Sequence, residues 1–404
     1  MANQQNKKLT TAIGGSLGMR SVESALHDDR DRGLSRNPRT RGCWVLLFGM
    51  LVVLTWCYSA ALSATPANWT PGADVGLAAR NILFSTVTQQ QGLSQGAINA
   101  IAQDRQGFVW FGTQEGLNRY DGYEIVVYDH QQDDPGSLSH DWVWSVYVDN
   151  AGDLWVGTDG GGLNRYDRAS DSFTRFRHAP GDPHSLSSDR VRVVYQDRNG
   201  RYWIGTDGGG LNRLDPATGR FVHFRHDANV PDSLPSDKVL AIFEDSTGKL
   251  WVGTEAGLAR MDHARGQFVV YRHDPSVADS LSNDQVRSIY QDRRGQLWVG
   301  TYRGGLNRFD PNSDGFANHR HSPEDPHSLS HDRVRSIYED RAGTLWIATD
   351  SGLNEWRPDS EAFVRYQHDP LQPGSLSDDR VTVIFQDSGD VLWVGTFNGV
   401  NKWN

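Results

Sequence analysis

The chain has 404 residues, of which 37% are hydrophobic, and it is rich in glycine (42 residues) and tryptophan (14 residues). Its formal net charge is −10, and because residues 1–64 are net basic, the rest of the chain carries −14. A domain this acidic lacks the basic footprint of a general nucleic-acid-binding protein, so we expect no nucleic-acid partner.

The first feature in chain order is an uncharged stretch of 22 residues, 43–64. As a helix it would be about 33 Å long, enough to cross a hydrocarbon core of about 30 Å. Arg36, Arg39 and Arg41 precede it, which predicts a cytoplasmic N-terminus and a periplasmic location for everything that follows. Two interpretations stay open: an anchor in the inner membrane, or a signal sequence that is cleaved after its small C-terminal residues.

Both cysteines of the chain, Cys43 and Cys57, lie in this stretch. The exported part therefore has no disulfide and no cysteine-ligated metal site. We expect it to bind neither a metal nor a cofactor.

The remainder of the chain is dominated by seven repeats. Each contains the pattern (L/V/Y)-W-(V/I/F)-(G/A)-T, and successive copies are 45–48 residues apart. The repeated residues are Trp110, Trp155, Trp203, Trp251, Trp298, Trp346 and Trp393. A period of this length without helical periodicity is typical of a propeller blade. We predict an all-β fold, a closed seven-bladed β-propeller of four-stranded blades over residues 82–404, after a leader (1–42), the segment 43–64 and a linker (65–81).

Each repeat predicts four short strands, with the tryptophan on the second. An Asp six residues before the Trp, and usually a Gly three residues before it, predict a tight hairpin between the first two strands, as at Asp197 and Gly200. The seventh copy reads Asp387-Ser388-Gly389-Asp390 at this place, which predicts a differently built turn.

The ends of the chain predict how the ring closes. The seventh copy ends after its third strand, whereas residues 82–87 match a fourth strand and stand before the first copy. We therefore expect residues 82–87 to complete the last blade, which would also remove two exposed sheet edges.

The repeated Trp, Asp, Gly and Leu-Asn-Arg positions are interpreted as scaffold, because seven equivalent copies cannot all face one ligand. Each Trp is expected to pack between neighbouring sheets. A histidine follows six of the outer strands, and we expect it to hydrogen-bond to the Ser-Leu-Ser linker; six dispersed histidines do not suit one metal. They are His130, His178, His226, His273, His321 and His368.

Several motifs resemble the two-component regulator propeller repeats of bacterial membrane sensors, over about residues 84–404. They are Gly92-Leu93-Ser94, the run 107–113, the run 116–123, and the later copies of Asp-Pro-(x)-Ser-Leu-Ser. The resemblance implies a periplasmic sensor module of hybrid histidine kinases or GGDEF-type sensors, often for oligosaccharides, and it suggests a homodimer.

In that family a second propeller, an immunoglobulin-like domain, a membrane helix and a histidine kinase or GGDEF domain usually follow. This sequence ends where the first ring closes. Two expectations stay open: the chain is part of a longer sensor, which the resemblance favours, or it is a separate binding module whose effector lies in a partner.

Candidate ligand-binding positions should vary between copies on the face that carries the linkers. We predict a rim of Trp144, Arg192, Arg287, Tyr302, Arg303, Arg335 and Phe397. Guanidinium groups bind carboxylate or sulfate, and aromatic rings pack on sugars, so the rim suits an oligosaccharide or another small polar ligand. The alternative is a solvated lattice of Arg–Asp pairs. Its sequence-adjacent carboxylates would be Asp189, Asp237, Asp332 and Asp379.

The expected function is a non-catalytic, extracytoplasmic, ligand-binding sensor module. A protein-binding or envelope-scaffold propeller is the alternative. A propeller lyase or glycosidase is less favoured, because catalysis needs acid and base groups that converge. His140 and His331 interrupt the linker pattern, but they lie four copies apart in a ring of seven.

Overall fold

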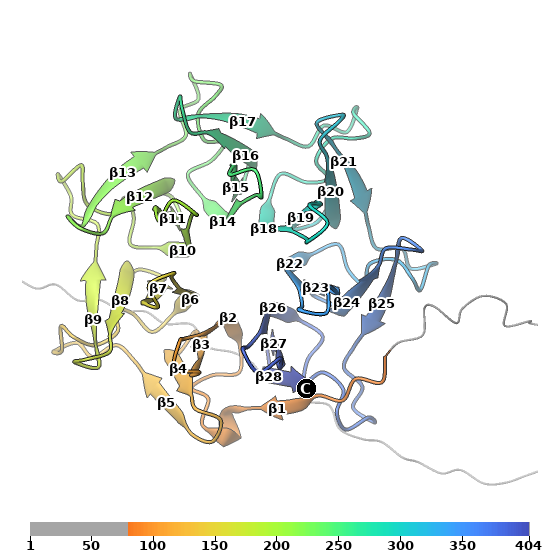
Figure 1. The fold of residues 1–404 in the computed structure, drawn as a ribbon, viewed down its shortest axis with the longest axis horizontal. Helices are drawn as coiled ribbons and strands as arrows, with labels where there is room; N and C mark the ends of the chain where they lie inside the picture. Colours follow the sequence, from red (N-terminus) through yellow and green to blue (C-terminus); the bar gives the residue numbers. More distant parts are fainter. Residues whose placement is uncertain (1–79, 404) are drawn as a thin grey trace, which may run out of the picture. The chain divides into compact units, whose positions relative to one another are not determined.

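The computed structural model describes residues 80–403, which form a ring of seven four-stranded antiparallel sheets (Figure 1). The prediction of an all-β, closed seven-bladed propeller is therefore confirmed. The segment 43–64 lies outside the described residues. None of the helical structure within residues 80–403 is long and apolar enough to cross a membrane; it includes a single turn, η1 (Gln89–Gln91).

The four strands of each blade lie in order from the central opening to the periphery (Figure 1). The innermost strands are β2 (Ile98–Gln103), β6 (Val143–Val148), β10 (Val191–Gln196), β14 (Val239–Glu244), β18 (Val286–Gln291), β22 (Val334–Glu339) and β26 (Val381–Gln386). The second strands are β3 (Val109–Thr113), β7 (Leu154–Thr158), β11 (Tyr202–Thr206), β15 (Leu250–Thr254), β19 (Leu297–Thr301), β23 (Leu345–Thr349) and β27 (Leu392–Thr396).

The other two strands form the outer part of each blade. The third strands are β4 (Leu117–Tyr120), β8 (Leu163–Asp167), β12 (Leu211–Asp215), β16 (Gly257–Asp262), β20 (Leu306–Asp310), β24 (Gly352–Arg357) and β28 (Gly399–Trp403). The fourth strands are β5 (Ile125–Tyr128), β9 (Ser172–Phe176), β13 (Arg220–Phe224), β17 (Gln267–Tyr271), β21 (Gly315–His319), β25 (Ala362–Tyr366) and, for the last blade, β1 (Ser85–Val87).

The second strand of each blade forms the packing layer between blades. All five of its residues are buried in every copy, because neighbouring blades cover both faces of the sheet. Trp110 of the first blade packs with Leu138, Val143 and Leu154 of the second, and the other blades repeat this arrangement. The predicted wedge role of the tryptophans is confirmed.

The residue two positions after each repeated Trp is Gly or Ala. It is small because the next blade approaches this strand closely. A Cβ on Gly205 would stand 2.5 Å from Cγ1 of Val239 in the next blade, closer than packed carbon atoms come. The sixth blade carries Ala348 at the same place, so that spacing is adjusted locally.

Each Trp also anchors the turn before it. Its Nε1–H donates to the carboxylate six residues earlier, at 2.7–3.0 Å in all seven blades. The other carboxylate oxygen accepts turn N–H groups, as Asp387 does from Gly389 and Val391. The prediction of a different seventh turn is wrong, because Asp390 adopts the left-handed conformation (φ 67°) that glycine supplies in the other six.

The linkers between blades are fixed by repeated polar side chains. The Nδ1–H of each of the six recurring histidines donates to the carbonyl of the linker leucine, at 2.6–2.8 Å, which confirms the predicted role. The buried Asn of Leu-Asn-Arg holds the linker serine; Asn118, for example, accepts from Ser94 N–H and donates to Ser94 Oγ. The linker face therefore has a rigid frame.

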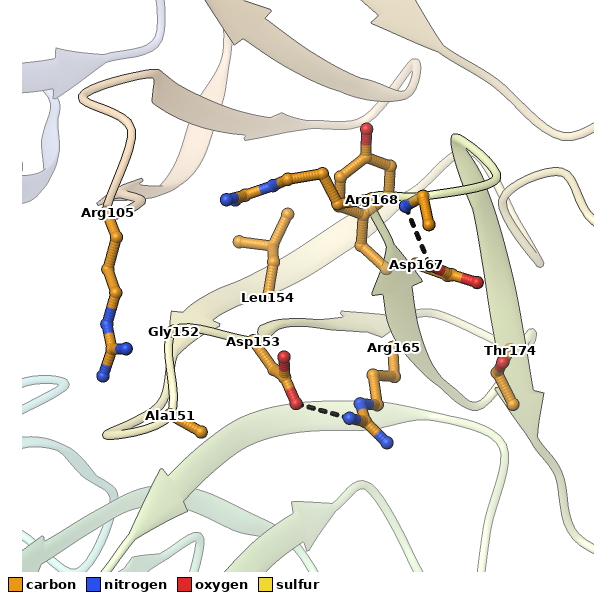
Figure 2. A pocket seen from close by; sticks show the side chains of 11 residues that line it. Arg105, Ala151, Gly152, Asp153, Leu154, Arg165, Asp167, Arg168 and Thr174 are labelled. Carbon is orange, nitrogen blue, oxygen red and sulfur yellow. Dashed lines mark hydrogen bonds and ion pairs between the residues drawn. The ribbon is translucent and has the colours of Figure 1, made fainter.

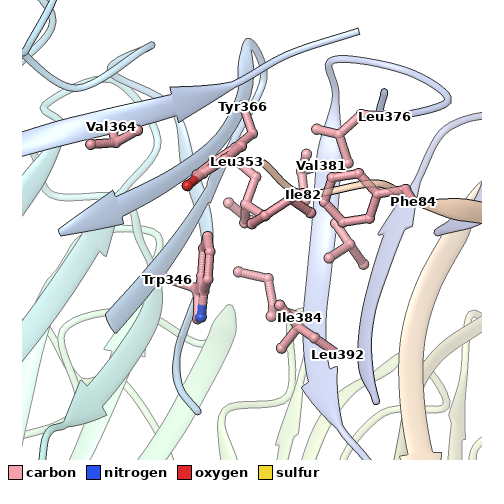
Figure 3. Close-up of a cluster of buried hydrophobic side chains, with 12 residues drawn as sticks. Ile82, Phe84, Trp346, Leu353, Val364, Tyr366, Leu376, Val381, Ile384 and Leu392 are labelled. Carbon is pink, nitrogen blue, oxygen red and sulfur yellow. The ribbon is translucent and has the colours of Figure 1, made fainter. Parts of the chain in front are cut away.

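The ring closes through the N-terminal strand. Strand β1 pairs antiparallel with β28, with Thr86 opposite Asn401. Just before it, Ile82 and Phe84 pack with residues of the sixth and seventh blades, including Trp346 (Figure 3). These contacts join both ends of the propeller into one core.

An ion pair with a buried carboxylate joins the same segment to the sixth blade. Arg80 pairs at 3.0 Å with Glu355, which is 1% exposed and stands where most copies have the Arg of Leu-Asn-Arg. The Tyr366 hydroxyl also donates to Glu355 at 2.8 Å. The repeat is thus altered where the N-terminal segment crosses it.

Candidate ligand-binding site

A cavity of about 250 Å³ lies where the seven inner strands begin, at the central opening. The second residue of every inner strand lines it. These residues are Asn99, Trp144, Arg192, Leu240, Arg287, Arg335 and Thr382, joined by Gln114 and Phe397 from turns between second and third strands. Each blade therefore contributes one side chain to the cavity from the same position, and the residue type at that position varies between blades.

A β-bulge at each of these positions explains why they meet. In all seven blades the pairing of the first two strands skips the second residue of the inner strand, as between Val286 and Ser288 around Arg287. A bulge bends the strand and redirects the extra side chain. Seven bulges thus carry seven variable side chains to one cavity.

Five of the seven predicted rim residues line this cavity: Trp144, Arg192, Arg287, Arg335 and Phe397. Tyr302 contacts the lining from the β19–β20 turn, with its ring centroid 4.6 Å from the Arg287 guanidinium. Arg303 is exposed and does not line the cavity, and its guanidinium lies 5.4 Å from the Tyr302 ring.

Two of the three lining arginines are paired with carboxylates. Arg192 contacts Asp207 at 2.7 Å, and Arg335 pairs with Asp350. Burial opposes ionisation of Asp207, but the adjacent cations, above all Arg192, outweigh it and hold the pKa of this carboxyl below its ordinary value. An Arg–Asp lattice therefore exists on the rim.

The partners in this lattice differ from those expected from sequence adjacency. Asp207 and Asp350 directly follow the Gly/Ala-Thr end of the second strand. The sequence-adjacent carboxylates Asp189, Asp237, Asp332 and Asp379 instead accept the backbone N–H groups of the recurring histidines, at 2.6–2.8 Å. In the sequence, the carboxylates that pair with Arg192 and Arg335 can be recognised by comparing the residue after Gly/Ala-Thr in the seven copies.

The predicted aromatic residues contact arginines. The Arg192 guanidinium lies 3.8 Å from the Trp144 ring centroid, and Arg380 lies 4.4 Å from that of Phe397. Arg287 and Arg333 both approach Tyr302, at 4.6 Å and 4.2 Å. The rings thus position guanidinium groups by cation–π contact, and the faces they use for this are not open to a sugar.

Arg287 differs from the other lining arginines. Its side chain has no hydrogen bond or ion pair with any residue between 80 and 403, and its Nε is buried. Burial lowers the pKa of the Arg287 guanidinium from its ordinary value, and nearby positive charges, chiefly that of Arg335, lower it further. A cation in this state lacks a counter-charge within the described structure.

A larger hollow of about 660 Å³ lies at the opposite end of the second blade (Figure 2). Two of its lining arginines are paired with carboxylates: Arg165 contacts Asp153 at 2.5 Å, and Arg168 contacts the buried Asp104 at 3.0 Å. Both of these arginines therefore have a counter-charge, unlike Arg287 of the central cavity.

Comparison with known proteins identifies the repeat. The model of the two-component regulator propeller matches seven segments: 92–115, 137–160, 185–208, 233–256, 280–303, 328–351 and 375–398. Each segment runs from a linker through the first two strands into the turn that follows the second strand, and the seven segments together contain all the predicted rim residues.

Two proteins of two-component systems and one further solved structure are similar to the chain. The extracellular domain of the putative hybrid two component system BT3049 from B. thetaiotaomicron is 30% identical, with a TM-score of 0.70; the match covers 80% of this chain and 42% of that one. Histidine kinase P4 of Formosa agariphila is 39% identical over 59 residues, which are 15% of this chain and 4% of that protein. A streptogramin B lyase is 16% identical, with a TM-score of 0.58 over 80% of this chain and 98% of the lyase, and shares the fold alone.

The chain thus spans less than half the length of the two-component relatives that it matches. It is homologous to an extracellular domain of a putative hybrid two component system. With seven matched repeats, one in each blade, the chain belongs to the two-component regulator propeller family.

Proposed function

We propose that this propeller is a non-catalytic, extracytoplasmic, ligand-binding sensor module of a bacterial signal-transduction system. Its ligand is an oligosaccharide or another small polar molecule, bound at the central cavity. The module acts outside the inner membrane and is attached or exported through residues 43–64. Its output belongs to a histidine kinase or GGDEF effector in a longer or separate chain, and the sensor works as a homodimer.

One observation supports this proposal most strongly. The positions whose residue type varies between blades line one cavity, while the residues repeated in every blade fix the turns and linkers. A ring of seven equal blades needs no variation at its axis for stability. Yet the bulged position is Arg in three blades and Asn, Trp, Leu or Thr in the other four. Arginine beside aromatic residues in a concave site is the composition expected of a site for a polar ligand.

The composition of the cavity also favours binding over catalysis. Among the described residues that line it there is no carboxylate, histidine, serine or cysteine, so no acid, base or nucleophile of those types faces a ligand. His140 and His331 each use Nδ1 to accept a linker N–H, from Trp142 and Arg333. The two-component relatives agree with a sensory role.

Thermal-shift measurements on the full chain in detergent test this function. The panel contains acidic and neutral oligosaccharides, each titrated over a wide concentration range. A ligand at 100 times its Kd stabilises the folded state by about 2.7 kcal/mol, and the shift grows with concentration. A dose-dependent shift with intact glycan recovered supports the sensor module. Cleaved glycan would instead indicate an enzyme, and silence across the panel would favour the protein-binding scaffold.

A further inference from the structure

The repeat itself provides the comparison that isolates Arg287. In the third, fifth and sixth blades the bulged residue is arginine: Arg192, Arg287 and Arg335. In the third and sixth blades the residue after the second-strand Thr is aspartate, and it pairs with that arginine. In the fifth blade the same position is Tyr302. The fifth blade therefore has the arginine but a tyrosine in the place of its carboxylate.

Tyr302 holds the guanidinium without neutralising it. Its ring lies 4.6 Å from the Arg287 guanidinium and 4.2 Å from that of Arg333. A cation–π contact attracts a guanidinium to a ring face and leaves its N–H donors, which point along the plane of the group, available to an acceptor. Arg287 is thus oriented and charged, and its donors are unused by residues 80–403.

Other positive charges surround this site. Arg333 and Arg335 of the next blade both pair with the one carboxylate of Asp350, so two cations share one counter-charge beside Arg287. The cavity lining contains three arginines and no carboxylate. The domain around it is strongly acidic, so this concentration of positive charge runs against the overall balance of the chain.

We propose that the ligand of the central cavity carries an anionic group, a carboxylate, sulfate or phosphate, and that Arg287 binds it. This inference rests on the proposed function and specifies the chemistry of its ligand. Guanidinium binds all three groups through paired N–H···O bonds. The anion supplies the counter-charge that Asp207 and Asp350 supply to the arginines of the third and sixth blades.

The size of the cavity limits what enters it. Its volume of about 250 Å³ lies below the roughly 300–1,000 Å³ of pockets that enclose a drug-sized molecule. It therefore admits a small anion or one charged sugar unit, with the rest of a longer ligand outside on the rim. Free anions and the acidic ends of oligosaccharides are both consistent with this chemistry, and the experiment separates them.

The test compares matched probes on the full chain by calorimetric titration. The probes are trigalacturonate, its neutral counterpart galactotriose, inorganic sulfate and inorganic phosphate. We expect trigalacturonate to bind and galactotriose to bind at least tenfold more weakly, since a charged hydrogen bond contributes about a factor of ten or more. Binding of sulfate or phosphate without trigalacturonate would support the anion site and identify a free anion as its ligand.

Two variants and one control locate the site. Arg287→Gln removes the charge, and Tyr302→Asp restores the carboxylate found in the third and sixth blades. Both should weaken binding of the anionic probe by at least tenfold. Arg294→Gln removes an exposed arginine from the opposite end of the same blade, in the β18–β19 turn, and should leave affinity within twofold of the wild type.

The stability of the ligand-free variants separates a binding role from a structural one. If Arg287 serves a ligand, Arg287→Gln removes an uncompensated charge and Tyr302→Asp compensates it, so both variants should melt at or above the wild-type temperature. If Arg287 supports the fold, Arg287→Gln should melt lower, and the proposal would be wrong.

Two binding results would also overturn the anion assignment. Equal affinity for trigalacturonate and galactotriose, unaffected by Arg287→Gln, would leave a neutral-sugar sensor and remove the anion site. No binding of any anionic probe, sulfate and phosphate included, would contradict the assignment as well.

Discussion

Asp245 shows what a repeated polar residue does in this ring. Its carboxylate accepts from the Trp251 indole and from three groups of its own turn, the Thr247 hydroxyl and the N–H groups of Thr247 and Lys249. Burial opposes ionisation of Asp245, but these hydrogen bonds outweigh it and hold its pKa below the ordinary value. The residue links a turn to the packing layer between blades.

This predicts a pH dependence of stability. Because the folded-state pKa of Asp245 is depressed, its contribution is complete above the unfolded value of about 3.9 and is lost as pH falls through the folded value. Asp245→Asn should lower the free energy of unfolding at pH 7 by roughly 1–3 kcal/mol. It should also flatten the loss of Tm between neutral pH and pH 3.

Thermal melts across that range check the prediction. Asp359→Asn, at an exposed carboxyl in the β24–β25 turn, is the matched control and should change neither quantity. Parallel pH profiles of wild type and Asp245→Asn would contradict this account of the turn.

The turn carboxylates follow from the sequence, whereas the carboxylate partners of the rim arginines do not. The Trp–Asp spacing predicts the turn because both partners are local and recur in all seven copies. The partner of Arg192 is Asp207, fifteen residues away and across a hairpin, whereas adjacency in the sequence suggests Asp189. Side-chain pairing across strands depends on register, which a bulge changes.

At the level of single strands, the bulge in each inner strand brings the side chains that vary between blades to one cavity. The period of two in a regular strand would alternate side chains between the two faces of a blade. The bulge at Arg287 breaks that alternation, as it does at the equivalent position of every other blade. The sequence does not predict these bulges, because unrelated residues such as Asn99, Leu240 and Thr382 stand at the bulged position.

The turns between first and second strands provide a second element-scale prediction. Asp390 holds a left-handed conformation in the seventh blade, where Gly295 stands in the fifth. Asp390→Gly should therefore stabilise the protein by about 0.5 kcal/mol, because a side chain is strained in this region. The exposed ion pair that it loses with Arg341 contributes little, and less at high salt.

Chemical denaturation in high salt measures this change. Gly295→Asp is the reverse substitution at a site where a Cβ meets no neighbour within 4 Å, so it isolates backbone strain and should destabilise by a similar amount. The account of the turn fails if both variants shift stability in the same direction.

At the scale of the whole molecule, closure makes the seven blades one unit. The sequence predicts closure because the missing fourth strand of the last copy is present before the first. The structure adds the pair of Arg80 with the buried Glu355, which the repeat pattern does not predict because Arg80 lies outside the repeat. The altered Leu-Asn-Glu of the sixth copy was the available signal.

A single charge placed in the closing strand should open the ring. Val87 is 5% exposed and packs against the first and seventh blades, so Val87→Asp buries a charge and detaches β1. We expect a loss of several kcal/mol and aggregation through the freed edge of β28. Val126→Asp, at a position 42% exposed on an outer strand, is the control.

Size-exclusion chromatography and thermal melts of both variants distinguish the two positions. Val126→Asp should stay at the size of the wild type and melt near its temperature. Equal behaviour of the two variants would mean that the N-terminal strand does not hold the ring closed.

An experimental structure of the full chain with trigalacturonate bound would show directly whether Arg287 binds an anionic ligand. We expect density at the central opening, with a carboxylate of the ligand within hydrogen-bond distance of the Arg287 guanidinium. Density that lies only in the hollow beside Arg105 and Arg168, or that places a neutral part of the sugar against Arg287, would contradict it.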